Sequence, residues 1–269
     1  MRLLFLLTAL LASGCAEPPA AASPPADSPA ADSTADLARF FPEGTAGAFV
    51  GYDTATGVTT RYGPTDVRRT PASTFKIFNS LATLDTRAVP DEHDVFEWDG
   101  VERWVASWNE SMDLEAAFQR SALWVYQGLA RRMGRDTLQA MLDRETYGNA
   151  TLGDSLEAAW LDGSLRISPE EQVAFIRRLR RGDTGFSDRA ETIVRRIMIA
   201  DSTGGAVLRG KTGWALRDGE NLGWWIGWLE RGGEAYVFAT LVESDDPEFR
   251  MVGARKPTTE AMLTHLSVR

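Results

Sequence analysis

Hydrophobic residues near the two ends of the chain follow patterns that are typical of strands. Residues 48–53 and 58–62 are short, largely apolar stretches separated by a turn at 53–57. Residues 222–229 and 236–242 are longer apolar runs separated by a polar, glycine-containing stretch at 230–234. Short apolar runs bounded by turn residues indicate buried strands joined as hairpins. We therefore expect two groups of strands, one near each end.

Between these groups the hydrophobic spacing is helical. The expected helices cover residues 73–84, 122–133, 136–145, 168–181 and 188–199, and a further helix covers 257–268 near the end of the chain. Ser168-Pro169-Glu170-Glu171 is a strong signal for the start of the helix expected over 168–181. Ser is a preferred N-cap, Pro suits the first turn and Glu stands three residues after the cap. Strands at both ends with helices between them predict an α+β fold, an α/β/α sandwich. Its central antiparallel sheet is built from both chain ends, with helices on both faces and an inserted, mostly helical region.

The first 35 residues differ from the rest. Residues 1–15 carry Arg2 followed by an apolar run that is too short to span a bilayer, as in an export signal. The run ends in Ala-Ser-Gly-Cys15, which resembles a bacterial lipobox, so we expect cleavage before Cys15 and lipidation of its thiol. Residues 16–35 are rich in Ala, Pro and Ser and predict a tether. The expected catalytic domain is 36–269.

Composition narrows the chemistry. The formal net charge is −9, which disfavours binding of nucleic acid through a basic surface. The chain has one cysteine and two histidines, His93 and His265, so a cysteine zinc site is excluded and we expect no metal and no dissociable cofactor. Of 29 basic residues, 26 are arginine and only three are lysine: Lys76, Lys211 and Lys256. A lysine retained against this bias can do what arginine cannot, because lysine can lose its proton.

Two of the three lysines lie in short motifs. Ser73-Thr74-Phe75-Lys76 places a hydroxyl and an amine one helical turn apart, and a serine becomes nucleophilic when a nearby base takes its proton. Lys211-Thr212-Gly213-Trp214 precedes the second pair of strands, so it could lie on a strand beside the serine. There it would offer a cation, a hydroxyl and a glycine that permits close approach of a substrate. Each motif alone is common, but their combination favours a serine acyl-transfer site.

The chain resembles the class D (oxacillinase-type) serine β-lactamases over roughly residues 40–268. The resemblance rests on six motifs in the family's order: Pro71-Ala72-Ser73-Thr74-Phe75-Lys76, Trp98-Asp99-Gly100, Tyr147-Gly148-Asn149, Trp160-Leu161-Asp162-Gly163, Leu165-Arg166-Ile167-Ser168 and Lys211-Thr212-Gly213. It implies hydrolysis of the β-lactam amide bond and antibiotic resistance. It also implies that Ser73 is acylated and that Lys76 is carboxylated by CO₂ to N6-carboxylysine, which acts as the general base.

The same resemblance assigns the remaining site residues. Trp160 would hold the carbamate through its indole N–H, and Ser121 would link the nucleophile to Lys211. Lys211 and Thr212 would bind the substrate carboxylate and assist proton transfer, and Arg255 would pair with the same carboxylate. Gly213 is the substrate-binding residue that would let the substrate approach the backbone. The backbone N–H groups of Ser73 and Trp214 would form the oxyanion hole. The loop at 147–149 is expected to have a structural role.

The chain departs from the family beside Ser121. The family's S-x-V motif reads Ser121-Ala122-Leu123 here, and Leu123 adds a methylene in a tight place. We expect this to alter water access and deacylation.

Other residues are assigned to simpler roles. His93 and His265 are expected near the surface, and Asp91 and Glu92 in a solvated loop. The tryptophans assigned to packing are Trp98, Trp104, Trp108, Trp224, Trp225 and Trp228.

Two alternatives share these motifs: a penicillin-binding protein and a non-hydrolytic β-lactam sensor, each acylated at Ser73. The expected partners are β-lactam small molecules, and contact with a membrane is expected only through the Cys15 lipid. The lipobox predicts the periplasmic face of the outer membrane, with a soluble periplasmic protein as the alternative. The protein is expected to be a monomer or a homodimer.

Overall fold

The computed structural model describes residues 37–217 and 219–268. The chain divides into two units, Met1–Ala30 and Ala31–Arg269, and every described residue belongs to the second unit. The predicted export signal, Cys15 and the tether at 16–35 lie outside the described residues.

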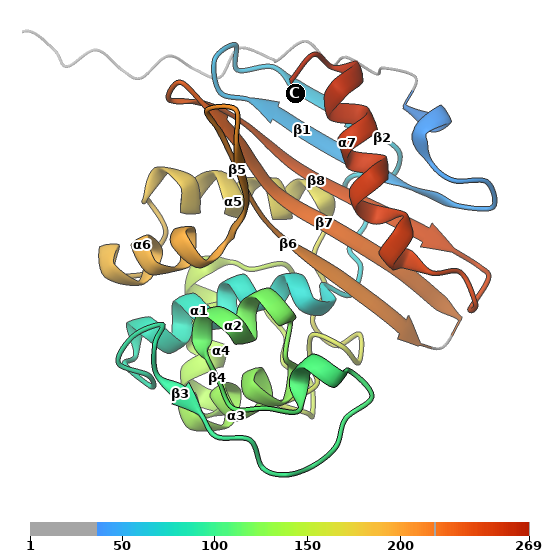
Figure 1. Ribbon diagram of the computed structural model, residues 1–269. Coiled ribbons are helices and arrows are strands. Elements are labelled where there is room, and N and C mark those ends of the chain that lie inside the picture. The colour runs from blue at the N-terminus through green and yellow to red at the C-terminus, as the bar shows by residue number, and fades with distance from the viewer. Residues whose placement is uncertain (1–36, 218, 269) are drawn as a thin grey trace, which may run out of the picture. The chain divides into compact units, whose positions relative to one another are not determined.

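A six-stranded antiparallel sheet with the order β2-β1-β8-β7-β6-β5 forms the centre of the fold (Figure 1). Its strands are β1 (Ala46–Asp53), β2 (Thr59–Tyr62), β5 (Ile199–Thr203), β6 (Ala206–Arg217), β7 (Glu220–Arg231) and β8 (Glu234–Ser244). β1 pairs with β8 from Ala46, opposite Glu243, to Asp53, opposite Tyr236. The two groups of predicted strands therefore join within one sheet, as expected.

Both faces of this sheet are covered, which explains why its central strands are apolar without interruption. On β7, Trp224 and Ile226 face the larger core, whereas Trp225 packs with Met262 in a second cluster. Met262 lies on α7 (Arg255–His265), which covers one face, and α5 (Pro169–Arg181) covers the other (Figure 1). Alternate residues point to opposite faces of a strand, so a strand between two helical layers needs apolar residues at every position.

A mostly helical region is inserted between β2 and β5. It contains α1 (Lys76–Asp85), α2 (Leu114–Arg120), α3 (Leu123–Met133), α4 (Arg135–Glu145), α5 and α6 (Asp188–Ile197), and two short strands, β3 (Val95–Phe96) and β4 (Met112–Asp113). Short 3₁₀ helices are η1 (Ala38–Phe40), η2 (Ala72–Phe75), η3 (Ala106–Trp108) and η4 (Met251–Gly253). The predicted capping box is confirmed: Ser168 Oγ accepts from the Glu171 N–H, and the Glu171 carboxylate accepts from the Ser168 N–H.

Several sequence-based expectations were wrong in detail. The helix expected over 188–199 ends at Ile197, and residues 199–203 pair with β6 as β5. The helix α2 was not predicted, because it has only seven residues; Asp113 caps it by accepting from the Ala116 N–H at 2.8 Å. The residues expected to form the first turn of a helix at Ser73 form the 3₁₀ helix η2 instead, and α1 begins at Lys76.

Three side chains also differ in burial from what the sequence suggested. Trp104 is 85% exposed and Trp98 is 38% exposed, so neither serves core packing. Glu92, expected in a solvated loop, is only 2% exposed and forms an ion pair with Arg196. A buried carboxylate needs such a partner, and the arginine that supplies it is more than 100 residues away in the sequence.

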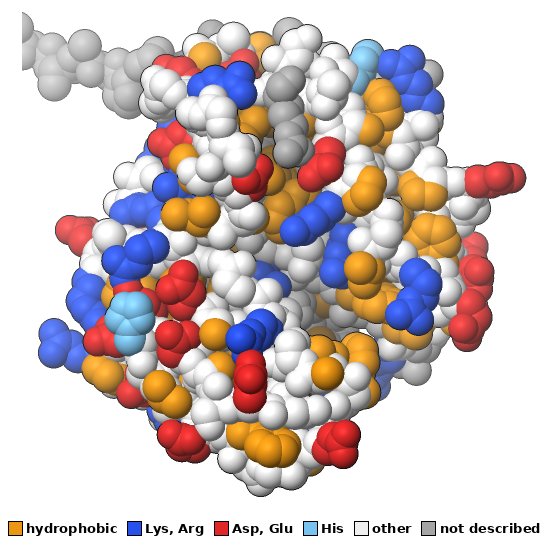
Figure 2. Space-filling view, viewed as in Figure 1, with side chains coloured by type: hydrophobic (Ala, Val, Ile, Leu, Met, Phe, Trp, Pro, Cys, Tyr) orange, Lys and Arg blue, Asp and Glu red, His pale blue; other side chains and the backbone are white. Residues whose placement is uncertain are grey.

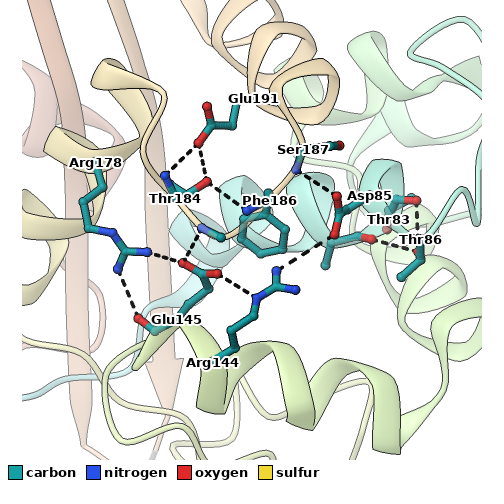
Figure 3. Close-up of polar contacts among 12 residues, drawn as sticks. Thr83, Asp85, Thr86, Arg144, Glu145, Arg178, Thr184, Phe186, Ser187 and Glu191 are labelled. Carbon is teal, nitrogen blue, oxygen red and sulfur yellow. Dashed lines mark hydrogen bonds and ion pairs between the residues drawn. The ribbon is translucent and has the colours of Figure 1, made fainter.

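Arginine ion pairs connect the helices. Figure 2 shows basic and acidic side chains interspersed over one face of the molecule. In Figure 3, the buried Glu145 carboxylate at the end of α4 contacts Arg178 of α5, accepts from Arg144 Nε at 3.0 Å and accepts from the Gly185 N–H at 3.2 Å. Because charged hydrogen bonds stabilise a buried carboxylate, this cluster fixes the end of α4 against α5 and the loop before α6.

Candidate active site

Ser73 and Lys76 lie in direct contact where η2 leads into α1. Lys76 Nζ is 2.9 Å from Ser73 Oγ, as the i, i+3 spacing predicted. The Lys76 side chain is almost completely buried, and its Nζ lies 5.2 Å from the centroid of the Tyr126 ring. Burial lowers the pKa of Lys76 from its usual 10.5 to about 7. A substantial fraction of Lys76 is therefore a neutral amine at neutral pH.

Trp160 lies in the same core and has an unused hydrogen-bond donor. Its ring stacks on Phe75, the residue before Lys76, with ring centroids 5.2 Å apart. The Trp160 side chain is completely buried, and its Nε1–H has no hydrogen-bond partner among the described residues. An unsatisfied buried donor costs about 1–3 kcal/mol, so a donor of this kind is expected to have an acceptor in the working state.

The second lysine lies on the central sheet. Lys211 is 4% exposed on β6, and its Nζ is 3.1 Å from Ser121 Oγ and 3.3 Å from the Thr212 carbonyl oxygen. Ser121 ends α2 in a left-handed conformation, with φ at 60°. Burial first, and then the positive charges of Lys76 and the α7 residues Arg255 and Lys256, lower the pKa of Lys211.

The outer edge of β6 is open beside the serine. β5 pairs with β6 only from Ala206 to Arg209, and no other described strand pairs with that edge beyond Arg209. A Cβ atom added to Gly213 would lie 2.9 Å from the Pro71 carbonyl oxygen and 3.2 Å from Thr74 Cγ2. Only glycine permits so close an approach between β6 and the turn that carries Ser73. Trp214 follows, and its Nε1 donates to Asn221 at 3.0 Å.

Arg255, the first residue of α7, joins the site through this strand. Its Nη1 donates to the Gly213 carbonyl oxygen at 2.8 Å, and burial lowers the pKa of Arg255 to about 10. Thr212 is half-buried between Lys211 and Gly213. The third lysine, Lys256, is exposed and lies 4.6 Å from the centroid of the Trp225 ring, on the α7 face of the sheet.

The structure thus connects Ser73 to Lys76, Ser121 to Lys211, and Gly213 to Arg255; the roles assigned to these residues remain predictions. Sequence reasoning missed two aromatic contacts: the Tyr126 ring lies against Lys76, and the Phe118 ring lies against Lys211. Tyr126 is on the apolar face of the helix expected over 122–133, but no sequence pattern shows that its ring contacts a lysine. His93 and His265 are exposed, as expected.

Neither a metal cluster nor a membrane-spanning helix occurs within residues 37–217 and 219–268. These residues contain no group of three or more His, Cys, Asp or Glu side chains placed to hold a metal ion. Their helices are also too short or too polar to cross a bilayer.

Comparison with known proteins agrees with this geometry. Residues 21–264 match the penicillin-binding protein transpeptidase domain. The β-lactamase OXA-48 of Klebsiella pneumoniae is 39% identical over 193 residues, covering 72% of each chain. The β-lactamase OXA-2 of Salmonella typhimurium is 40% identical over 177 residues, which cover 66% of this chain and 63% of that protein.

Solved structures give the same result. The class D β-lactamase of Sebaldella termitidis has a TM-score of 0.86 and 34% identity, covering 90% of this chain and all of that one. The C-terminal domain of the Bacillus licheniformis BlaR penicillin-receptor has a TM-score of 0.83 and 28% identity, covering 88% and 96% of the two chains. Fold and site define a domain of the penicillin-binding transpeptidase type. Within that type, the chain belongs to the class D serine β-lactamases.

Proposed function

We propose that this chain hydrolyses the β-lactam amide bond of penicillin-type antibiotics through an acyl-Ser73 intermediate, and so confers resistance. The observation that carries the proposal is the 2.9 Å contact between Ser73 Oγ and the buried Lys76 amine. Ser73 Oγ attacks the β-lactam carbonyl carbon, the C–N bond breaks and the ring nitrogen receives a proton. Water then attacks the ester carbonyl, releases the penicilloic acid-type product and restores the Ser73 hydroxyl.

The residues present fit a carbamate on Lys76. Only a neutral amine reacts with CO₂, and burial holds the pKa of Lys76 near 7. The unpartnered Trp160 Nε1–H is a donor without an acceptor in the same apolar core. When present, a carbamate supplies a base of suitable strength for the Ser73 proton and for the proton of the deacylating water. Bicarbonate is its source, and no other cofactor is proposed.

The remaining residues bind and orient the substrate. Ser121 and Lys211, whose Oγ and Nζ lie 3.1 Å apart, pass the proton taken from Ser73 on to the leaving nitrogen. Lys211, Thr212 and Arg255 bind the substrate carboxylate at the open edge of β6, where Arg255 keeps N–H donors besides the one bonded to Gly213. Gly213 lets the substrate approach the backbone. The N–H groups of Ser73 and Trp214 stabilise the oxyanion that forms on attack.

Steady-state hydrolysis of a chromogenic cephalosporin tests this proposal. With added bicarbonate we expect many turnovers per enzyme, and none after Ser73→Ala or Lys76→Ala. Lys256→Ala is the matched control: this exposed lysine contacts none of the proposed machinery, so turnover should be retained, with at most a shift in pH dependence because its charge lowers the pKa of Lys211. Stoichiometric acylation without turnover would identify a sensor, the role suggested by the similarity to the BlaR domain. No acylation at all would contradict every variant of the proposal.

We further propose that the chain is exported and anchored by a lipid on Cys15 at the periplasmic face of the outer membrane. The lipobox-like end of the signal supports this, since the only cysteine in the chain occupies the modified position. Mass spectrometry of the mature N-terminus would detect the acyl groups. Cys15→Ser should move the protein to the soluble periplasmic fraction, and an unmodified Cys15 would contradict the proposal. The functional unit is a monomer or a homodimer, which light scattering would distinguish.

A further inference from the structure

The Thr74 hydroxyl, one residue after the nucleophile, both donates and accepts a hydrogen bond. It donates to the Pro71 carbonyl oxygen at 2.7 Å and accepts from Gln172 Nε2 at 2.9 Å. A threonine hydroxyl has a single donor, which the bond to Pro71 uses. Thr74 and Gln172 are both 0% exposed.

The bond to Pro71 closes the Ser73 turn, and the bond to Gln172 fixes this turn against α5. On its other side, Thr74 Cγ2 lies 3.2 Å from the position that a Gly213 Cβ would take on β6. Thr74 therefore sets the position of the Ser73 turn relative to the strand that carries Lys211.

The Gln172 side chain has no other described bond. Its Oε1 is buried and has no hydrogen-bond partner in the described part of the chain. Burying an amide with an unpaired acceptor is unfavourable, so an apolar residue would serve a purely structural role at this core position better. The bond to Thr74 is what the glutamine supplies.

We propose that Gln172 is a positioning residue, which acts through the Thr74 hydroxyl to hold Ser73 at attacking distance. This inference rests on the proposed function, because it concerns the acylation step. Displacement of a reacting atom by about 1 Å can lower a rate about 100-fold. Gln172 does not touch substrate, so its bond to Thr74 should affect the acylation rate constant and leave the affinity for the intact β-lactam unchanged.

Single-turnover acylation by a fluorescent penicillin, with saturating bicarbonate, tests the proposal. Thr74→Val keeps the shape and removes the hydroxyl, and should lower the acylation rate constant about 100-fold with the noncovalent Kd unchanged. Gln172→Met removes the bond to Thr74 and should lower the acylation rate constant about 10-fold. Thr74→Ser keeps the hydroxyl and should restore most of the rate.

Thr83→Val is the matched control. Thr83 is also buried on α1, and its Oγ1 donates to Asn79 at 3.2 Å. The control should lower the midpoint of urea unfolding to a similar extent and leave acylation normal. Equal acylation by Thr74→Val and Thr83→Val, or no rescue by Thr74→Ser, would overturn the positioning role alone. Absence of acylation in the unaltered chain would overturn the proposed function as well. If Thr74→Val does not fold, Gln172→Met decides the question.

Discussion

The unused donor on Trp160 gives the sharpest test of how Lys76 works. Trp160 and Trp224 are both 0% exposed, which makes them a matched pair. Trp224 Nε1 donates to the Thr70 carbonyl oxygen at 2.9 Å, whereas Trp160 Nε1 has no described partner. The substitutions Trp160→Phe and Trp224→Phe remove similar volumes from the same core, but only Trp224→Phe removes a hydrogen bond that the structure shows.

The structure sets the expected magnitudes. Without bicarbonate, Trp224→Phe leaves a buried carbonyl unpaired, while Trp160→Phe removes an unsatisfied donor. Both substitutions should lower the free energy of unfolding. The Trp160→Phe variant should remain more stable than the Trp224→Phe variant by about 1–3 kcal/mol. With bicarbonate, the unaltered protein gains a hydrogen bond to a charged acceptor, worth about 1.5–3 kcal/mol. Loss of this bond should weaken apparent bicarbonate affinity about 10- to 150-fold in Trp160→Phe.

Two measurements follow from this reasoning. Urea unfolding in degassed buffer, with and without added bicarbonate, gives the stability of the three proteins. Titration with ¹³C-labelled bicarbonate, followed by NMR, gives the fraction of Lys76 carboxylated. Bicarbonate should stabilise the unaltered protein and Trp224→Phe, and should have a much smaller effect on Trp160→Phe. The reasoning would be refuted if Trp160→Phe bound bicarbonate as tightly as the unaltered protein.

Four further outcomes are expected. Gly213→Ala should lower the free energy of unfolding by about 1–3 kcal/mol and slow acylation, because the new Cβ would lie 2.9 Å from the Pro71 carbonyl oxygen. Urea unfolding measures the first effect and burst kinetics measure the second. Unchanged values would count against the close approach of β6 to the Ser73 turn. The pKa of Lys76 is lowered to about 7, so kcat/KM should rise with pH through about 7. Without bicarbonate, Lys76 of the unfolded chain binds more protons than Lys76 of the folded chain between pH 7 and 10.5, so stability should rise with pH across that window. Lys76→Met should reduce the rise and leave the part that comes from the lowered pKa of Lys211. Leu123→Val should change kcat or its dependence on bicarbonate, because this half-buried side chain follows the Ser121 segment; identical kinetics would exclude a role in water access.

The sequence by itself determined the outline of the fold and predicted which residues react. Apolar runs bounded by turn residues predicted β1, β2, β7 and β8, and period-3.6 patterns predicted most helices, because a residue's place on a face depends on local geometry. Scarce lysines marked Lys76 and Lys211, and the i, i+3 spacing predicted the contact of Lys76 with Ser73, since both lie within one turn. Contacts between neighbours in the sequence need no tertiary information.

Only the tertiary structure decided contacts between distant segments. The 3.1 Å contact of Lys211 with Ser121, the Arg255 bond to Gly213 and the Gln172 bond to Thr74 join residues 42 to 98 positions apart. Burial likewise depends on the whole fold, so Trp104 was wrongly assigned to the core. The pKa of Lys76 belongs to the same class of property, because it is set by loss of water around the amine. Packing of remote elements excludes that water, and no local pattern records it.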